Sequence, residues 1–345
     1  MPPRAPIGLS KALSPDECNT EVFGASLAGR NALITGGASG LGAAIALAYA
    51  ETGYLHRSIQ PRRPPDSADP ARTGSAYVTL VDRNEKLGIE RATALRGKGF
   101  HAQFVAADVT SWPSQVAAFK AAIGFHPDRR LDVVVASAGV LGDPFVAPGE
   151  RGVASLAAEH DPPRPRTDAW EVNAIGLSFT AKLAQLYFDM PAAGTSESAV
   201  PPKSLVLLAS LAPYLGFPLA TAYEGSKAGA RAVFKNVRAV FAARGHRCNM
   251  IAPWVVETPM TVELSRTVAA LGKPAGDVGQ VVRAAVRFAD DPAVNGRSWA
   301  VGLHRIFDMG DDREGGDGEV GLREIFTNGL PQWDFIAERL LAEGL

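Results

Sequence analysis

The chain has 345 residues, of which 46% are hydrophobic and 21% are charged, enough to bury the core of one large domain or two small ones. This composition excludes a chain that is disordered throughout. Lys and Arg total 35 against 36 Asp and Glu, a net charge of -1, which provides no cationic excess for binding nucleic acid or an anionic membrane. We therefore expect the partner to be a small molecule or a second copy of the chain.

Cysteine and histidine usage argues against disulfides and metal sites. The two cysteines, Cys18 and Cys248, are far apart in sequence, and the six histidines are scattered without a ligand spacing. Residues 1–25 lack a continuous apolar segment, and the uncharged run 204–223 is broken by prolines and a glycine. We expect no metal, no secretion signal and no membrane span, and a reducing, cytoplasmic location.

Short apolar runs alternate with longer helical stretches along the chain, which is typical of repeated βαβ units. The expected strands are Asn31–Thr35, Tyr77–Val81, Ala102–Ala106, Val133–Ser137, Ser204–Ala209, Arg247–Ala252 and Arg297–Val301. The expected helices are Leu41–Glu51, Asn84–Arg96, Pro113–Ile123, Asp168–Phe188, Tyr223–Ala243 and Val278–Ala289. This order predicts an α/β, three-layer, doubly wound Rossmann fold with a seven-stranded parallel sheet.

Stretches rich in proline, glycine or acidic residues interrupt this alternation. Three of them predict insertions near 54–75, 142–166 and 191–203. We expect an N-terminal extension over 1–26, a single domain over 27–310 and a C-terminal extension over 311–345. The last of these could cover the chain's own site or that of a neighbouring copy.

A glycine-rich turn follows the first expected strand and precedes an Ala-rich helix. There, free backbone N–H groups and the positive end of the helix dipole can meet a dinucleotide pyrophosphate. The residues expected to bind it are Gly36, Ser39, Gly40, Leu41 and Gly42. The spacing differs from G-x-G-x-x-G, and a tight strand-to-helix turn without a ligand is the alternative.

Two acidic residues end the next two strands. The Asp82 carboxylate could accept hydrogen bonds from both hydroxyls of an adenosine ribose and would repel a 2′-phosphate, which favours NAD over NADP. Arg83 could instead supply a cation for that phosphate. Asp108 and Val109 could hold the adenine edge, and helix capping is the alternative role for Asp108.

Candidate catalytic groups gather in the second half of the chain. Tyr223 and Lys227 are four residues apart and so share one face of a helix, where an ammonium could stabilise a phenolate whose pKa is ordinarily about 10. Ser210 ends a buried strand, where ligand groups are presented in such sheets. Asn173 lies in the preceding helix and could form a local backbone bond or relay protons to water. Tyr-x3-Lys alone could be a surface coincidence.

Together and in this order, these motifs resemble those of the short-chain dehydrogenase/reductase family, from about Leu27 to Gly310. The resemblance implies that Lys227 lowers the pKa of Tyr223 and holds the nicotinamide ribose, and that Tyr223 exchanges the proton. Ser210 would bind the substrate oxygen and Asn173 would anchor a relay water. Further residues that it implies at the cofactor are Ala138, Gly139, Tyr223, Lys227, Pro253, Val256 and Thr258, the last two near the carboxamide.

The chain departs from the family pattern at two places. Trp254 stands where the family often has glycine, and its indole could line the substrate site or displace the backbone. Ala136-Ser137-Ala138-Gly139 replaces Asn-Asn-Ala-Gly and loses two side-chain amides that brace the central sheet; a hydroxyl can replace only part of that bonding. Neither change removes a group that transfers protons.

The resulting functional prediction is an NAD-dependent short-chain alcohol dehydrogenase that interconverts a hydrophobic secondary alcohol and its ketone. Alternatives are an NADPH-dependent ketone reductase and a nucleotide-binding scaffold without turnover. Four apolar residues near the catalytic segments, Tyr214, Leu215, Phe217 and Trp254, favour an apolar or aromatic substrate, unless they only complete the core. Residues Pro259–Gly276 are expected to form a lid. The resemblance also implies a homodimer or homotetramer through helices Asp168–Phe188 and Tyr223–Ala243.

Overall fold

The computed structural model describes residues 7–21, 27–55, 75–143, 145, 161–191, 202–217, 220–302 and 304–310. Within them, one eight-stranded sheet has the order β3-β2-β1-β4-β5-β6-β7-β8. The strands are β1 (Asn31–Thr35), β2 (Tyr77–Asp82), β3 (Ala102–Ala106), β4 (Val133–Ala136), β5 (Ser204–Leu208), β6 (Arg247–Pro253), β7 (Ser298–Val301) and β8 (Ile306–Asp308). The doubly wound α/β fold is confirmed.

The seven expected strands all form, and they are parallel to one another. The expected count is one short, because β8 adds an antiparallel strand at the edge, beside β7. This strand has three residues, Ile306–Asp308, too few to show an alternating pattern. The inner strands β1, β4, β5 and β6 are buried along their whole length, as strands covered on both faces are, and the few polar residues in them, among them Asn31, Arg247 and Asn249, are buried as well.

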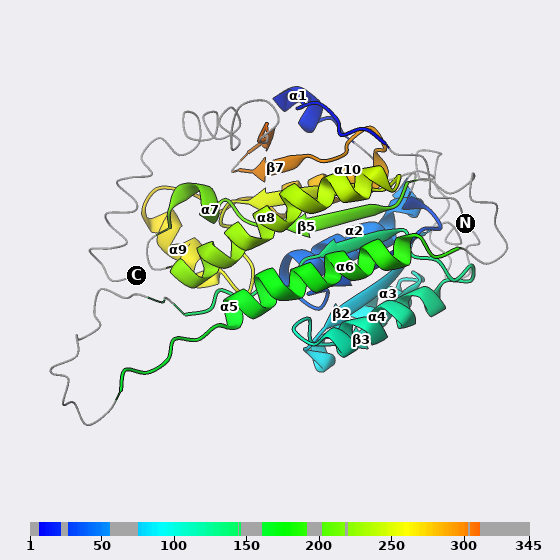
Figure 1. Cartoon of the computed structure of the whole chain (residues 1–345), viewed down its shortest axis with the longest axis horizontal. Helices are drawn as coiled ribbons and strands as arrows, with labels where there is room; N and C mark the ends of the chain where they lie inside the picture. Colours follow the sequence, from blue (N-terminus) through cyan, green and yellow to red (C-terminus); the bar gives the residue numbers. More distant parts are fainter. Residues whose placement is uncertain are drawn as a thin grey trace.

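Helices cover both faces of the sheet (Figure 1). One face packs against α2 (Gly40–Leu55), α3 (Glu85–Gly97) and α10 (Val278–Asp290). The other packs against α4 (Trp112–Phe125), α6 (Leu177–Phe188) and α8 (Thr221–Ala243). The short helices are α1 (Pro15–Cys18), α5 (Asp168–Trp170), α7 (Ala212–Leu215) and α9 (Val262–Ala270). No helix in the described residues is long and apolar enough to cross a membrane.

The expected helix over 168–188 is interrupted by a π-helical segment, η3 (Glu171–Gly176), between α5 and α6. A π-helical turn inserts an extra residue into the turn without changing the apolar periodicity enough to be read from the sequence. Most of the expected insertions and all of the expected C-terminal extension lie outside the described residues.

The N-terminal segment first bonds to Ala242 and Asn295, through Ile7 and Ser10, and then reaches the outer edge of β8 through Leu13 and Asn19. The side-chain amide of Asn19 donates to the carbonyl of Ile306 (2.8 Å) and accepts from its N–H (3.1 Å), as a neighbouring strand would. The N–H of Leu13 donates to Asp308 (3.1 Å). The segment therefore satisfies backbone groups at a sheet edge that would otherwise be open to pairing with another chain.

Candidate active site

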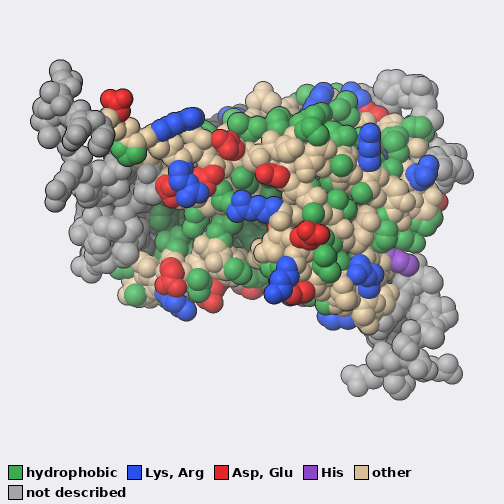
Figure 2. Space-filling model, turned by 90° about the horizontal axis from the view of Figure 1, so that it is seen from below, with side chains coloured by type: hydrophobic (Ala, Val, Ile, Leu, Met, Phe, Trp, Pro, Cys, Tyr) green, Lys and Arg blue, Asp and Glu red, His purple; other side chains and the backbone are tan. Residues whose placement is uncertain are grey.

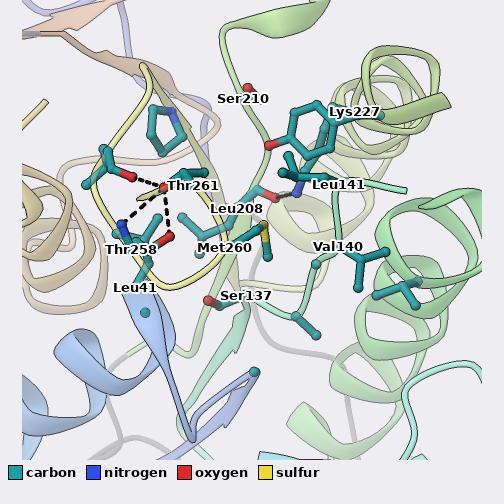
Figure 3. A pocket seen from close by; sticks show the side chains of 18 of the residues that line it. Leu41, Ser137, Val140, Leu141, Leu208, Ser210, Lys227, Thr258, Met260 and Thr261 are labelled. Carbon is teal, nitrogen blue, oxygen red and sulfur yellow. Dashed lines mark hydrogen bonds between the residues drawn. The ribbon is translucent and has the colours of Figure 1, made fainter. Parts of the chain in front are cut away.

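A cavity of about 660 Å³ opens at the carboxyl ends of the parallel strands, around the point where the strand order reverses between β1 and β4. All the expected cofactor and catalytic residues except Asn173 line it: Gly36, Ser39, Gly40, Leu41, Gly42, Asp82, Arg83, Asp108, Val109, Ala138, Gly139, Ser210, Tyr223, Lys227, Pro253, Val256 and Thr258. Segments far apart in the sequence thus meet at one cavity. Figure 3 shows part of this lining.

Two glycines of the glycine-rich turn are required by close backbone contacts. Gly36 has a positive φ of 67°, and a Cβ on it would lie 2.8 Å from the Cα of Ala138. A Cβ on Gly42 would lie 2.2 Å from the carbonyl oxygen of Gly36. Gly40 begins α2 at the cavity, where free N–H groups and the helix dipole suit a phosphate. The turn therefore has a structural reason for its glycines and also the geometry of a phosphate site.

Asp82 is tied to this turn. Its carboxylate accepts hydrogen bonds from the N–H of Ala38 (3.1 Å) and of Asn84 (2.9 Å), one on each oxygen. Each carboxylate oxygen has a second lone pair, so both can still accept from a ribose hydroxyl. The neighbouring Arg83 is exposed at the same rim.

Asp108 closes a local turn. One of its oxygens accepts from both the N–H and the hydroxyl of Thr110, each at 2.8 Å. These contacts form a local turn before α4, whose N-cap residue is Ser111, so the alternative of a capping role for Asp108 is wrong. Asp108 lies on the cavity wall beside Val109.

Ser210 follows β5, and its hydroxyl is hydrogen-bonded to the buried Tyr223 on α8. Lys227, one turn further along α8, donates to the carbonyl of Leu208 (2.9 Å), and its Nζ lies 5.8 Å from the centroid of the Tyr223 ring. Ser210 also accepts from the N–H of Ala212 (3.1 Å). The three side chains therefore meet, as their spacing predicts.

The pKa of Tyr223 differs from the expectation. Burial raises it above its ordinary value, and the hydrogen bond from Ser210 lowers it only in part. Burial also lowers the pKa of Lys227, to about 8. The expected lowering by the ammonium is therefore not seen in the protein by itself, because burial dominates the pKa of both groups and the charge of Lys227 is not among the causes of the Tyr223 shift.

Asn173 is fully buried in η3 and does not reach the cavity. Its side chain makes a reciprocal pair with the N–H and carbonyl of Val140, both at 2.8 Å. It also donates to Ser226 (2.9 Å), whose hydroxyl donates to the carbonyl of Tyr223 (2.6 Å). The expected local backbone bond is not what forms, because Val140 is 33 positions from Asn173 in the sequence. The contacts instead connect the segment after β4 to the catalytic helix, and the relay role stays a prediction.

The missing amides after β4 are partly replaced by a hydroxyl. Thr35 Oγ1, at the end of β1, accepts from the N–H of Ser137 (3.1 Å) and of Ala138 (3.3 Å). This clamp joins β1 to the segment that follows β4. It maintains the close approach that Gly36 requires.

Trp254 lines the cavity and does not displace the backbone from the sheet. Its N–H donates to Val301 on β7 (2.9 Å), and its indole, 4% exposed, packs with Leu215 and Val268. The indole N–H donates to the carbonyl of Pro274 (3.4 Å). Trp254 is thus both a core residue and part of the cavity wall.

The remaining wall is largely apolar. Of the four expected substrate residues, Leu215, Phe217 and Trp254 line the cavity, whereas Tyr214 does not and packs instead against Arg231 (4.9 Å). Met260 and Leu264, from the segment expected to form a lid, also line it, and so does Leu141, which carried no sequence signal. Figure 2 shows a hollow with a largely hydrophobic floor, and acidic and basic side chains interspersed around it.

Two further residues hold this wall and carried no sequence signal beyond their position beside a motif. The Glu224 carboxylate accepts from the N–H of Phe217 (2.6 Å), and so anchors the loop after α7 to the catalytic helix. The Thr261 hydroxyl bonds to Val256 and Thr258 in the segment expected at the nicotinamide. In the part of the chain that the structure describes, no group of three or more His, Cys, Asp or Glu could hold a metal ion.

Residues 67–286 match the family model described as Enoyl-(Acyl carrier protein) reductase. A 5′-hydroxyaverantin dehydrogenase of Emericella nidulans is 37% identical over 315 residues, covering 87% of this chain and 93% of that protein. A 5′-hydroxyaverantin dehydrogenase of Dothistroma septosporum is 35% identical, covering 89% and 95%. An NADP-dependent dehydrogenase of Cochliobolus lunatus is 31% identical, covering 78% and 87%. With the cavity and its Ser-Tyr-Lys group, these matches show an oxidoreductase that uses a nicotinamide cofactor, and the chain belongs to the short-chain dehydrogenase/reductase family.

Proposed function

We propose that this protein is an NAD(H)-dependent enzyme that interconverts a hydrophobic secondary alcohol and its ketone, with Tyr223 as general acid and base. One observation carries the proposal: a single cavity contains both the glycine-rich turn and the hydrogen-bonded Ser210 and Tyr223. A cavity so lined can hold a dinucleotide along the turn and a substrate oxygen at the two hydroxyls.

In the proposed mechanism the glycine-rich turn would hold a dinucleotide, whose nicotinamide would supply the hydride for reduction and accept it for oxidation. Ser210, whose single hydroxyl proton points to Tyr223 when no substrate is bound, would turn that proton to the substrate oxygen and position the oxygen beside Tyr223. For oxidation, Tyr223 Oη takes the alcohol proton as a phenolate; for reduction, it gives a proton to the ketone oxygen. Lys227, held by the carbonyl of Leu208, provides a positive charge near the phenol while its pKa of about 8 keeps it protonated.

The proposed preference for NAD rests on Asp82. A carboxylate near the adenosine ribose would repel a 2′-phosphate, and its two oxygens keep lone pairs for the ribose hydroxyls. The NADP-dependent name of the Cochliobolus lunatus relative, together with the exposed Arg83, keeps an NADPH-dependent reductase as the second candidate. Titration of NADH and NADPH by fluorescence decides between them: a dissociation constant for NADPH equal to or below that for NADH contradicts the preference.

The proposed substrate is a bulky apolar alcohol. The wall contributed by Leu141, Leu215 and Trp254 is apolar, and two relatives are named for 5′-hydroxyaverantin. That compound is therefore the first substrate to test. We also propose that the α9 segment acts as a lid over the cavity, because Met260 and Leu264 line the cavity. The assay follows cofactor reduction at 340 nm and identifies the ketone by mass. Binding of cofactor without turnover of this or any related alcohol would favour the scaffold alternative.

A homodimer or homotetramer is proposed through α6 and α8. Ile175 in η3 is 47% exposed and Leu186 in α6 is 50% exposed, and both are large hydrophobic side chains on the surface of this helical stretch. Light scattering at micromolar concentration tests this, and a monomer would contradict it. We also propose a cytoplasmic location, on the strength of two buried, unpaired cysteines.

A further inference from the structure

Thr261, at the start of the lid helix, has a hydroxyl with three polar partners. It donates to the carbonyl of Val256, accepts from the N–H of Thr258 (3.1 Å) and bonds to the hydroxyl of Thr258 (2.9 Å), as Figure 3 shows. A hydroxyl has one proton to donate and two lone pairs with which to accept. These three bonds use all of them.

The direction of each bond follows from this count. A carbonyl oxygen can only accept, so the single proton of Thr261 points to Val256. The backbone N–H of Thr258 can only donate, so it occupies one lone pair. The remaining bond must then take its proton from the Thr258 hydroxyl, and Thr261 accepts it.

Because the Thr258 hydroxyl donates its proton to Thr261, only its lone pairs remain for a ligand in the cavity that Thr258 lines. It can accept a hydrogen bond from a ligand but has no proton left to donate. An N–H donor, such as the amide of a carboxamide, is complementary to it, whereas a carbonyl oxygen or a carboxylate is not. The methyl side of Thr258 faces Gly40 at the glycine-rich turn, where a Cβ on that glycine would lie 3.6 Å from Thr258 Cγ2.

A second observation also indicates that the Thr261 side chain bonds to the Val256–Thr258 segment and not to its own helix. Thr261 is the N-cap residue of α9, where a threonine ordinarily accepts a hydrogen bond from the N–H two or three residues ahead. Here the side chain makes no such bond. The helix therefore forgoes a stabilising cap, and the hydroxyl serves the Val256–Thr258 segment instead.

We infer that Thr261 is a positioning residue that fixes the Thr258 hydroxyl as a hydrogen-bond acceptor for the carboxamide N–H of the nicotinamide. This rests on the proposed function and on the family resemblance, which implies that Thr258 lies near that carboxamide.

The test compares two ligands on three variants. NADH contains the nicotinamide and ADP-ribose lacks it, so both are titrated by calorimetry against wild type, Thr261→Val and Thr261→Ser; if the wild type prefers NADPH, the 2′-phosphorylated pair replaces them. Valine keeps the branched shape without the hydroxyl, and serine keeps the hydroxyl. We expect Thr261→Val to weaken NADH binding about tenfold, to leave ADP-ribose binding unchanged, and Thr261→Ser to restore NADH binding.

Two results would overturn the inference: NADH affinity unchanged in Thr261→Val, or an equal loss for NADH and ADP-ribose, which would assign Thr261 to the fold of the loop only. Thr258→Val separates this from the proposed function. If Thr258→Val binds NADH as the wild type does, then Thr258 does not contact the carboxamide and the site assignment itself is wrong. If Thr258→Val weakens NADH binding and Thr261→Val does not, only the positioning role fails.

Discussion

Replacing Tyr223 with phenylalanine isolates the proton transfer from the other contributions of this side chain. The aromatic ring remains in its buried place beside Lys227, and only the hydroxyl and its bond to Ser210 are lost. Loss of a general acid and base lowers turnover by about 10²- to 10⁴-fold, or roughly 3–5 kcal/mol in activation free energy. We expect a decrease in kcat of this size.

The same substitution should change stability and cofactor binding little. One hydrogen bond contributes about 0.5–1.5 kcal/mol to the free energy of unfolding, and phenylalanine no longer carries a buried hydroxyl that needs a partner. Thermal unfolding and NADH titration should therefore stay close to wild type. Tyr214→Phe is the matched control, because Tyr214 lies on Arg231 outside the cavity and should keep full turnover. Undiminished kcat in Tyr223→Phe, with substrate and cofactor saturating, would refute the role of the phenol.

Three further predictions concern charge and the sheet edge. Because the pKa of Tyr223 is raised, the phenol stays protonated at neutral pH. The rate of alcohol oxidation should therefore increase as pH rises, and the rate of ketone reduction should fall at high pH. Profiles of kcat/KM against pH that are flat in both directions would count against this prediction. Asp308→Asn should lower the free energy of unfolding by about 3–5 kcal/mol in denaturant titrations, because it leaves the buried Arg297, 2.6 Å away, without its counter-charge; a change under about 1 kcal/mol contradicts it. Asn19→Leu removes both bonds to Ile306 and should expose the edge of β8, so that light scattering shows association increasing with concentration, while Lys11→Ala on the same segment should not.

The positions of the inner strands could be predicted from the sequence because they are buried on both faces. Val133–Ala136 has no polar residue to interrupt it, and its burial is complete in the sheet. The edge is different. At the edge of β8, the side-chain amide of Asn19 makes the two bonds to Ile306 that a neighbouring strand would make. No periodicity in the sequence indicates that a residue near the N-terminus pairs with Ile306.

The site could be predicted as a set of residues, but not as a set of contacts. The turn at Gly36, the carboxylate of Asp82 and the Tyr-x3-Lys pair all line one cavity, as expected. The partner of Asn173 was beyond sequence reasoning, because its contact with Val140 depends on a π-helical turn that shifts the register of the helix. Tyr214 directly precedes Leu215, which lines the cavity, yet the turn of α7 directs Tyr214 to Arg231.

The pKa of Tyr223 shows why spacing alone gave the wrong sign. Four residues on a helix place Lys227 beside the phenol, and attraction between opposite charges would favour the phenolate. Burial acts on each group separately: it disfavours the phenolate, which raises the pKa of Tyr223, and it disfavours the ammonium, which lowers the pKa of Lys227 to about 8. Both shifts favour the uncharged forms, so the pair by itself does not ionise the tyrosine. A protein that must make a phenolate here therefore needs additional positive charge in the cavity, and an oxidised nicotinamide ring is a group of that charge.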